Sequence, residues 1–475
     1  MHVLGRFAPT SLVRVLSPLL LATSVGLAAL PAAAQISPSL TALRPIKGIS
    51  YQPSPSDDCQ LQTQYNSVAP CSTPLNGYNP TYYDTDFYNT DFALLWGPGT
   101  TASKGRNDLA TLKAQGINFL HLYNWNAERD HGTFLDAVVT NNMKVMVPIS
   151  NYTACLIVGG CQSVPPGAGS YQKAYDNVQK IFKQVYPNGG STPHAGIGAW
   201  GIFNEFDYNN IDPANVAFVI QAILQLEAAA GVTGANRLPF MVPASNAVNA
   251  GTQYRWFQTA QALYQAIPNA NPTIPPGVLA NIAVSVTLQN AQVNNTTTYG
   301  GVTVGAVPAD FWTTRYIATV NPFTSGPTIN AFITSPSQFQ SAFPGAAVTT
   351  GSQTWNAAWN SLPPLFLSEM GINIGGSGGT PQSQAAWILS QLQCTNPWAV
   401  DPASTPQGYF IGSNVFEFEY EGDNGQWGMW TFPSPVAFTT GTTSSGATYR
   451  IDTLNAQPAW ASVLTGFQAT AKSCS

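Results

Sequence analysis

Charged side chains are scarce in this sequence. Lys, Arg, Asp and Glu make up 8% of its 475 residues, and acidic residues outnumber basic ones, giving a formal net charge of −5. The chain therefore lacks the clustered basic surface that nucleic-acid binding requires, and no nucleic-acid partner is predicted. Because only 22 residues are Asp or Glu, a carboxylate that closes an apolar segment is a candidate for function.

Histidine and cysteine are also few, which limits the predicted chemistry. The chain has four histidines and six cysteines, no Cys-x-x-Cys sequence, and no histidines at the close spacing of zinc ligands. No metal site and no cofactor are predicted. Residues 375–379 match the Gly-x-Ser-x-Gly pattern of serine esterases, but such an enzyme needs a histidine after the serine. None follows His194, which argues against an esterase.

The N-terminus has the pattern of a secretory signal peptide. Arg6 and Arg14 precede an apolar stretch at 15–30, and Ala32-Ala33-Ala34 supplies a small-residue cleavage site. We expect a signal peptide at 1–34 and a secreted mature domain at 35–475, in the extracellular space or the periplasm. A signal anchor is the alternative, although the apolar stretch is shorter than the roughly 20 residues of a membrane span. No later segment predicts a membrane anchor.

All six cysteines follow the predicted signal peptide. An even number of cysteines in an exported chain favours disulfides. Pairing of neighbours gives three candidate disulfides: Cys59–Cys71, Cys155–Cys161 and Cys394–Cys474. The other connectivities of six cysteines stay open.

Strand-like apolar segments alternate with helical patterns along most of the chain. Eight candidate strands lie at 46–51, 117–123, 144–149, 197–203, 238–243, 312–320, 364–368 and 409–418. Candidate helices lie at 104–115, 132–142, 170–185, 215–230, 253–267, 335–343 and 381–393. Eight such repeats predict an α/β fold, a (β/α)₈ TIM barrel with its core at about 46–430. Long decorated loops are expected at 54–101 and 269–309, the second with an extra hairpin, and a short C-terminal extension at 431–460.

Two of the candidate strands end in a glutamate. Glu205 closes the fourth and Glu369 the seventh, and catalytic residues of this fold lie at the C-terminal ends of strands. Glycoside hydrolysis uses two carboxyl groups, one to protonate the leaving oxygen and one to attack or to activate water. The pair therefore predicts a glycosidase. The alternative is structural: Glu205 would cap the next helix, and Glu369 would pair with a core arginine such as Arg315.

Five short motifs occur at these strand ends. They are Gly48-Ile49-Ser50-Tyr51-Gln52-Pro53, His121-Leu122-Tyr123, Phe203-Asn204-Glu205, Leu367-Ser368-Glu369-Met370-Gly371 and Val415-Phe416-Glu417-Phe418. In order and spacing the chain resembles the clan A (β/α)₈ retaining glycosidases, and within them the β-1,3-glucanases and β-1,3-glucanosyltransferases of families seventeen and seventy-two. Each motif alone is weak, but together they span about 46–430.

The resemblance implies roles for individual residues. Glu205 would be the general acid/base and Glu369 the nucleophile, with Asn204 binding the sugar 2-hydroxyl. Tyr51 and Tyr123 would line the subsite of the reacting sugar.

One departure from the family concerns the sixth strand. There the family usually has a tyrosine beside the nucleophile, whereas this strand ends in Thr319-Val320-Asn321-Pro322-Phe323. Tyr316 lies deeper in the strand. Asn321 is a substrate-binding candidate at this end.

Aromatic and acidic residues near the strand ends complete the predicted site. Trp125, Trp427 and Trp430 could offer flat apolar faces to sugar C–H groups, although for any single tryptophan a place in the core is an equal expectation. Glu417 is expected to bind or support substrate, and its neighbour Glu419 to face solvent.

These observations predict a secreted retaining glycosidase or transglycosidase that acts on β-glucan, with β-1,3 linkages favoured. Glu205 is expected to have the higher pKa of the two glutamates. Hydrolysis and transfer are not distinguished by the sequence. A barrel that binds glycan or the cell wall without catalysis is the alternative.

Overall fold

The structure is a computed structural model of the 475-residue chain. It describes residues 42–56, 86–160, 164–245, 280, 281, 284, 287, 288, 296–308, 311–334, 348–350, 353–355, 363–375, 379–401, 410–419, 426–433, 437–444, 446, 448–472 and 474. The predicted signal peptide at 1–34 lies outside the described residues and stays a prediction.

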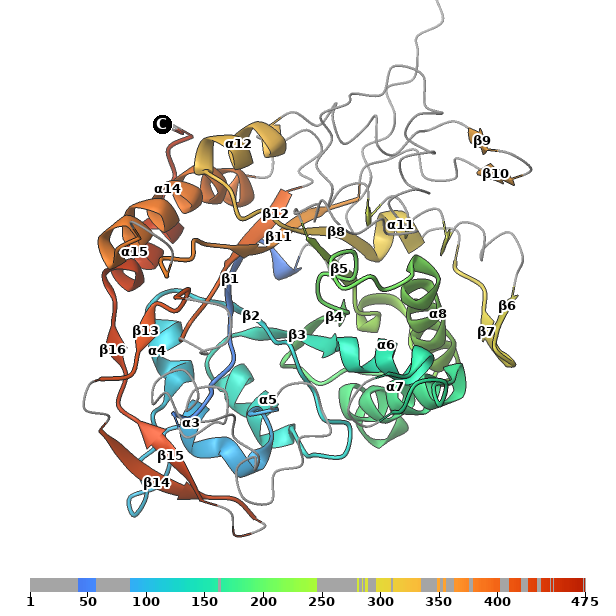
Figure 1. Ribbon diagram of the computed structural model, residues 1–475, viewed down its shortest axis with the longest axis horizontal. Coiled ribbons are helices and arrows are strands. Elements are labelled where there is room, and N and C mark those ends of the chain that lie inside the picture. The colour runs from blue at the N-terminus through green and yellow to red at the C-terminus, as the bar shows by residue number, and fades with distance from the viewer. Residues whose placement is uncertain are drawn as a thin grey trace, which may run out of the picture. The chain divides into compact units, whose positions relative to one another are not determined.

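Eight parallel strands form a closed barrel in the order β1-β12-β11-β8-β5-β4-β3-β2 (Figure 1). They are β1 (Ile46–Ser50), β2 (Phe119–His121), β3 (Lys144–Ile149), β4 (Ile197–Ile202), β5 (Phe240–Ser245), β8 (Tyr316–Asn321), β11 (Leu365–Met370) and β12 (Phe410–Val415). Each corresponds to one candidate strand, so the (β/α)₈ prediction is confirmed. The start of the sixth candidate is wrong, because Phe311–Thr314 form a short helix, α11, before β8.

The barrel interior is closed by one apolar layer. Every strand contributes one buried side chain to it: Ile46, Phe119, Met146, Ala199, Met241, Ile317, Phe366 and Ile411. Phe119 and Phe366 meet edge to face, with ring centroids 5.8 Å apart. Parallel strands buried on both faces read as continuous apolar segments, which is why the sequence pattern finds them.

Side-chain alternation decides which residues reach the mouth of the barrel. Successive side chains of a strand point to opposite faces, so Ser50, His121 and Asn321 share the parity of the interior layer. Tyr51 and Tyr316 have the other parity, and both pack in the larger apolar cluster outside that layer.

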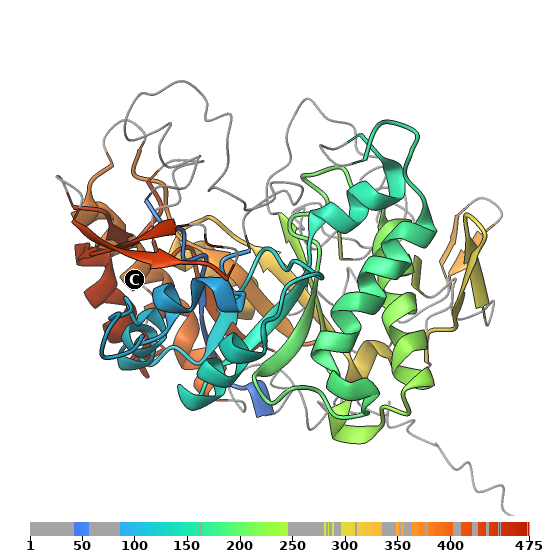
Figure 2. The same cartoon turned by 90° about the horizontal axis from the view of Figure 1, so that it is seen from below.

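Helices cover the barrel between the strands. Those that match candidate helices are α4 (Asp108–Ala114), α5 (Gly132–Thr140), α7 (Tyr171–Val185), α8 (Pro213–Ala229) and α14 (Pro381–Val400). The sequence missed α6 (Asn151–Val158), α12 (Gly326–Thr334) and α15 (Pro458–Phe467). The candidate helices at 253–267 and 335–343 lie outside the described residues. Figure 2 shows α7 and α8 side by side on one flank. No helix in the described part of the chain has the length and hydropathy of a membrane span.

Helix α14 continues seven residues beyond its predicted end. It begins with a capping box between Thr380 and Ser383 and runs through Pro397 in its last turn. Pro397 cannot donate a backbone hydrogen bond to the carbonyl oxygen of Gln393, and the helix ends three residues later, at Val400.

Small strand pairs and helical turns decorate the barrel. The predicted hairpin in the loop at 269–309 is β6 (Thr296–Tyr299) with β7 (Val302–Gly305). Other short elements are η1 (Thr90–Phe92), α3 (Ala93–Trp96), η2 (Pro187–Gly189), η3 (Gly234–Asn236), β9 (Val348–Thr350), β10 (Gln353–Trp355), β13 (Trp430–Thr431) and β16 (Asn455–Ala456).

The C-terminal extension is longer than predicted. A hairpin of β14 (Phe438–Thr442) and β15 (Thr448–Asp452) is followed by α15, which packs on α14. The predicted disulfide between Cys394 and Cys474 is confirmed and ties the chain end to α14. Cys155 is also disulfide-bonded, but Cys161, Cys59 and Cys71 lie outside the described residues.

Candidate active site

Glu205 and Glu369 both lie at the C-terminal mouth of the barrel. Glu205 follows β4 in a tight turn in which Phe203 (φ 58°) and Glu205 (φ 46°) adopt the left-handed conformation. Glu369 lies in β11, where the register against β12 shifts between Leu367 and Met370. Such a bulge re-aims side chains, and here Ser368 and Glu369 both contact residues of the barrel mouth.

The structural alternative for the two glutamates is not supported. Arg315 pairs with Glu227 instead, with Nη1–Oε2 and Nη2–Oε1 distances of 3.0 and 2.9 Å. The N-terminus of α8 is capped by Asp212, whose side chain accepts from the Ala214 N–H at 2.8 Å. Neither glutamate has the structural role proposed for it.

Asn321 lies between the two carboxylates. Its Nδ2 donates to Glu205 Oε1 at 3.1 Å, and its side chain lies close enough to Glu369 to lower the pKa of that carboxyl group. The Ser368 hydroxyl donates to Asn321 Oδ1, so the orientation of the amide is fixed. Two carboxyl groups that neighbour the same amide lie close together, and a short separation of about 5–5.5 Å between carboxyl groups is typical of retaining glycosidases.

Tyr123 contacts the carboxylate of Glu369. Its Oη lies 2.8 Å from Glu369 Oε1 and 2.7 Å from Ser50 Oγ, and Asn414 Nδ2 donates to Ser50 Oγ at 2.8 Å. A phenol has one proton, so a proton given to Glu369 leaves Oη free to accept from Ser50. Gly48 leaves room for Asn414, because a Cβ at position 48 would lie 2.5 Å from Asn414 Oδ1.

His121 supports this arrangement without charge. Its ring stacks on Tyr123 at 4.4 Å between centroids, and its Nδ1 lies 3.1 Å from the Ser368 carbonyl oxygen. A carbonyl only accepts, so Nδ1 carries the proton. Burial lowers the pKa of His121 to about 4. His121 is therefore neutral near pH 7 and does not neutralise Glu369, which lies 3.9 Å away.

Asn204 is held by its backbone and presents its side chain to Glu369. The side chain of Asn151 makes two hydrogen bonds to the backbone of Asn204. Its Oδ1 accepts from the Asn204 N–H at 2.8 Å, and its Nδ2 donates to the Asn204 carbonyl oxygen at 3.0 Å. The Asn204 side chain lies close enough to Glu369 to lower the pKa of that carboxyl group. Its Oδ1 is buried and has no hydrogen-bond partner among the described residues. A free acceptor next to the carboxylate suits a ligand hydroxyl.

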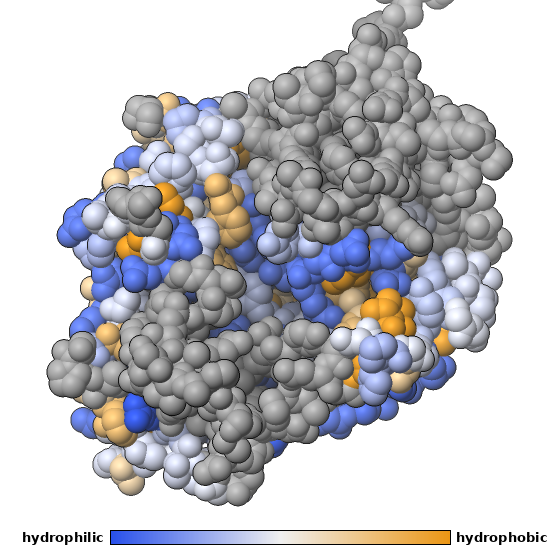
Figure 3. Space-filling model, in the orientation of Figure 1, coloured by the Kyte–Doolittle hydropathy of each residue, from blue (hydrophilic) through white to orange (hydrophobic). Residues whose placement is uncertain are grey.

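A cavity borders the loop that carries Glu205. It has a volume of about 250 Å³ and is lined by α6, including Asn151, and by Asn209 and Asn210 of the loop after Glu205. Asn209 Nδ2 donates to the Glu205 carbonyl oxygen at 3.0 Å. On the face shown in Figure 3, a hollow near the middle is bordered by both hydrophilic and hydrophobic residues.

Burial and mutual charge shift the titration of both carboxyl groups. Burial raises the pKa of Glu205, and the bond from Asn321 lowers it. Burial raises the pKa of Glu369 well above its ordinary value, and the charge of Glu205 raises it further. Three side-chain donors oppose that rise: Tyr123, Asn204 and Asn321. The larger rise is thus on Glu369, the reverse of the order expected from the sequence, because Glu369 is the more deeply buried.

Asp207 is a third carboxyl group near the pair that sequence reasoning missed. Burial is the main reason that its pKa is raised to about 8, and the charge of Glu205 adds to the rise. The Ser245 N–H donates to its Oδ1 at 2.7 Å. The sequence indicates its place near the pair only through its position two residues after Glu205.

Three predicted substrate-binding residues are not brought to the glutamate pair. Tyr51 is fully buried, and its Oη donates to Asp108 Oδ2 at 3.0 Å. Trp125 donates to Gln184 Oε1 at 2.7 Å and stacks on His131.

Trp430, the third of them, packs on Phe418 and Trp460, with ring centroids 6.0 and 5.5 Å away. Its indole Nε1 is buried and has no hydrogen-bond partner among the described residues.

Trp427 belongs to an aromatic group beside Tyr123. Its ring centroid lies 5.4 Å from that of Phe416 and 4.9 Å from that of Phe323. Phe416 in turn lies 6.3 Å from Tyr123. Phe323 is 38% exposed, an unusual exposure for a phenylalanine next to a polar site. Sequence reasoning missed both phenylalanines as site residues, although they stand in the strand-end motifs.

The two acidic residues after β12 differ in role. Glu417 is buried, and its charge raises the pKa of Tyr123, which places it near the site. The expectation that Glu419 faces solvent is wrong: it is 1% exposed and lies 2.8 Å from Arg106 Nη2. A buried carboxylate needs such a partner.

No group of three or more His, Cys, Asp and Glu side chains within the described ranges is arranged to hold a metal ion.

Comparison with known proteins finds similarity only among solved structures. No protein-family model and no curated protein matches the chain. ScGas2 in complex with compound 6 matches at 12% identity and a TM-score of 0.43, covering 89% of this chain and 65% of that one. Saccharomyces cerevisiae Gas2p in complex with laminaripentaose matches at 10% identity and a TM-score of 0.37, covering 76% and 58%.

This chain thus spans just under two thirds of the first of these proteins and less of the second.

Proposed function

We propose that this protein is a retaining glycoside hydrolase or transglycosidase that cleaves β-glucan through Glu205 and Glu369. The observation that supports this most is the amide of Asn321, which donates to Glu205 and neighbours Glu369. A shared neighbour favours the short carboxyl separation that double displacement requires.

In the first step, Glu369 attacks the anomeric carbon while Glu205 protonates the departing glycosidic oxygen. The C–O bond to the leaving sugar breaks, and an ester bond from the sugar to Glu369 forms. The two carboxyl groups share one proton before the step, because their charges repel. The step requires that proton on Glu205: the donors to Glu369 favour this, and the deeper burial of Glu369 opposes it.

In the second step, Glu205 acts as a base. It takes a proton from water or from a sugar hydroxyl, whose oxygen attacks the anomeric carbon and releases Glu369. Water gives hydrolysis and a sugar gives transfer. The free Oδ1 of Asn204 would accept a hydrogen bond from the 2-hydroxyl of the reacting sugar, as the motif resemblance implies.

The substrate class rests on the motif resemblance. β-1,3-glucan is proposed as the glycan, and Trp427 with Phe323 and Phe416 would supply apolar faces for sugar rings. Secretion is proposed from the predicted signal peptide at 1–34 and suits a polymeric substrate outside the cell.

The test is to incubate the purified mature protein with a β-1,3-gluco-oligosaccharide and follow the products by mass spectrometry. Glu369→Gln is the test variant, and Glu128→Gln, which changes an exposed ion pair with Lys180, is the control. We expect shorter products, or products both shorter and longer than the substrate, from wild type and control only. An unchanged oligosaccharide with all three proteins would contradict β-1,3 specificity, and binding without turnover on every β-glucan would favour a glycan-binding barrel.

A further inference from the structure

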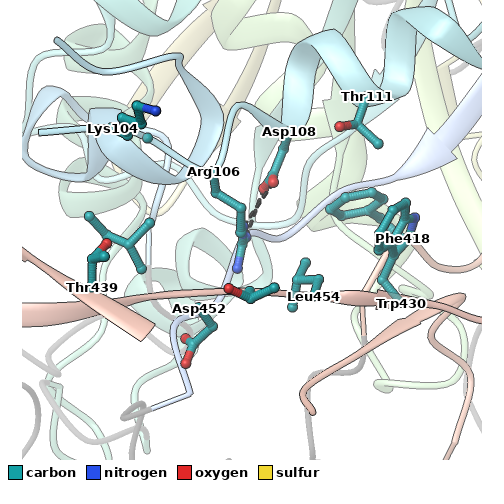
Figure 4. A pocket seen from close by; sticks show the side chains of 12 residues that line it. Lys104, Arg106, Asp108, Thr111, Phe418, Trp430, Thr439, Asp452 and Leu454 are labelled. Atoms are coloured by element: carbon teal, nitrogen blue, oxygen red, sulfur yellow. Dashed lines mark hydrogen bonds and ion pairs between the residues drawn. The ribbon is translucent and has the colours of Figure 1, made fainter. Parts of the chain in front are cut away.

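A second cavity lies beside the C-terminal hairpin. It has a volume of about 350 Å³, within the range of small-ligand sites. Its walls come from the segment that leads into α4, from the chain after β12 and from β14 and β15. Figure 4 shows Arg106 at its centre, with Phe418 and Trp430 on one side and Thr439 on the other. Neither Glu205 nor Glu369 lines it.

Two buried donors at this cavity have no acceptor. The side chain of Arg106 is 6% exposed, and its Nη1 is buried without a hydrogen-bond partner in the described structure. The indole Nε1 of Trp430 is in the same condition. Unsatisfied buried donors are rare in native proteins and call for an explanation. Because neither nitrogen has accessible surface, a ligand with oxygen acceptors would satisfy both only after a shift of the Arg106 and Trp430 side chains.

The charges around Arg106 disfavour an anionic ligand. Asp108 accepts from Arg106 Nε at 2.8 Å and from Nη2 at 2.7 Å, and Glu419 lies 2.8 Å from Nη2. Asp452 also lines the cavity and accepts from the Ser56 N–H at 2.7 Å. Lys104 adds a positive charge at the exposed rim. Three acids thus surround one buried guanidinium, and its charge is already compensated.

The cavity also has an aromatic wall. The rings of Phe418 and Trp430 lie 6.0 Å apart at an angle of 44°. Unpaired donors, carboxylate acceptors and aromatic faces form the combination that matches a neutral polyhydroxylated ring, whose hydroxyls both donate and accept and whose C–H groups pack on aromatic faces.

We propose that this cavity is a second carbohydrate site, separate from the glutamate pair, which binds a neutral pyranose unit. Arg106 Nη1 and Trp430 Nε1 donate to ring hydroxyls, and Asp452 accepts from one. The site binds without cleaving, because its two neighbouring carboxylates, Asp108 and Glu419, are both paired with Arg106. It would hold a glucan chain, or its end, on the flank of the enzyme.

The test is fluorine NMR of the full-length mature protein labelled with 5-fluorotryptophan. The signal of Trp430, one of twelve tryptophans, is assigned by its loss in Trp430→Phe. The protein is titrated with methyl β-D-glucoside and, separately, with D-glucuronate and inorganic phosphate. We expect a saturable shift of the Trp430 signal with the neutral sugar and none with the two anions. This readout does not depend on turnover, so it stands apart from the proposed function.

Two matched variants locate the effect. Thr439 and Thr440 are neighbouring exposed residues of β14, but only Thr439 lines the cavity, because their side chains point to opposite faces. Thr439→Trp should fill the cavity and reduce the sugar-dependent shift at least tenfold, whereas Thr440→Trp should keep it. No saturable shift with the sugar, a shift with the anions only, or an equal shift in both variants would overturn the proposal.

Discussion

The hydroxyl of Tyr123 lies 2.8 Å from Oε1 of Glu369. In the enzymes that the motifs resemble, a tyrosine of the sixth strand lies beside the nucleophile. Here that strand is β8, and its tyrosine, Tyr316, donates to Asn281 at 2.6 Å instead. A hydroxyl two residues after β2 thus lies beside Glu369, whereas the family pattern has a tyrosine of the sixth strand at this place.

Tyr123→Phe removes this hydroxyl and little else. The ionised form of Glu369 loses a donor, so we expect kcat/KM to fall by about 10²-fold and the acidic limb of the pH–rate profile to move to higher pH. Tyr316→Phe is the matched control, since it removes a buried hydroxyl away from the carboxylates. Steady-state kinetics across pH measure both effects, and equal losses in the two variants would argue against a direct role of Tyr123.

Asn321→Asp tests the bridge between the glutamates. The variant keeps the shape of the side chain but replaces the shared donor with a third carboxyl group. Glu205 loses a hydrogen bond and both glutamates gain a repulsive neighbour, so their pKa values rise further. We expect kcat to fall by about 10²- to 10³-fold, with a folded protein by circular dichroism. Wild-type turnover in this variant would mean that the amide of Asn321 does not position the two glutamates.

Glu205→Gln should change the titration of Glu369 in a defined direction. The negative charge of Glu205 raises the pKa of Glu369, so its removal should lower that pKa. With an aryl β-glucoside whose leaving group needs no protonation, residual activity should extend to lower pH than in the wild type. The exposed control Glu128→Gln should leave the acidic limb of the pH–rate profile unchanged. A shift of that limb to higher pH in Glu205→Gln would contradict the electrostatic coupling between the two glutamates.

Asp207 should make the folded state less stable as the pH rises. Its pKa is raised from 3.8 to about 8 by burial, so the folded protein retains a proton that the unfolded chain has lost. The stabilisation by that proton is complete below about pH 4 and is lost as the pH rises through about 8. Asp207→Asn should therefore flatten the fall of the melting temperature between these values. Identical slopes for wild type and variant would show that Asp207 is ionised in the folded state at neutral pH.

The strands and the glutamate pair could be predicted because both leave a local signal. Strands of a parallel barrel are buried on both faces and read as apolar segments, and a carboxylate at their end stands out in a chain with few charges. Helix α6 was missed because its sequence, Asn-Tyr-Thr-Ala-Cys-Leu-Ile-Val, is apolar around most of its circumference and shows no amphipathic period.

The contacts of single side chains were less predictable. Alternation along β1 sends Ser50 to the barrel mouth and Tyr51 to the outer core, but the motif contains both. The bulge at Glu369 breaks the same alternation in β11, so alternation alone would have predicted that the Glu369 side chain points away from the barrel mouth. Trp125 satisfies Gln184 in a buried network, a pairing between residues 59 positions apart that no local pattern indicates.

The most direct test of the central claim is the stereochemistry of the first product. The protein is mixed with a β-1,3-gluco-oligosaccharide, and the anomeric protons are followed by ¹H NMR before mutarotation. A pair of carboxylates bridged by one amide predicts that the β anomer appears first, because two displacements restore the configuration. An α anomer at the earliest time points would show single displacement by water and would contradict a covalent intermediate on Glu369.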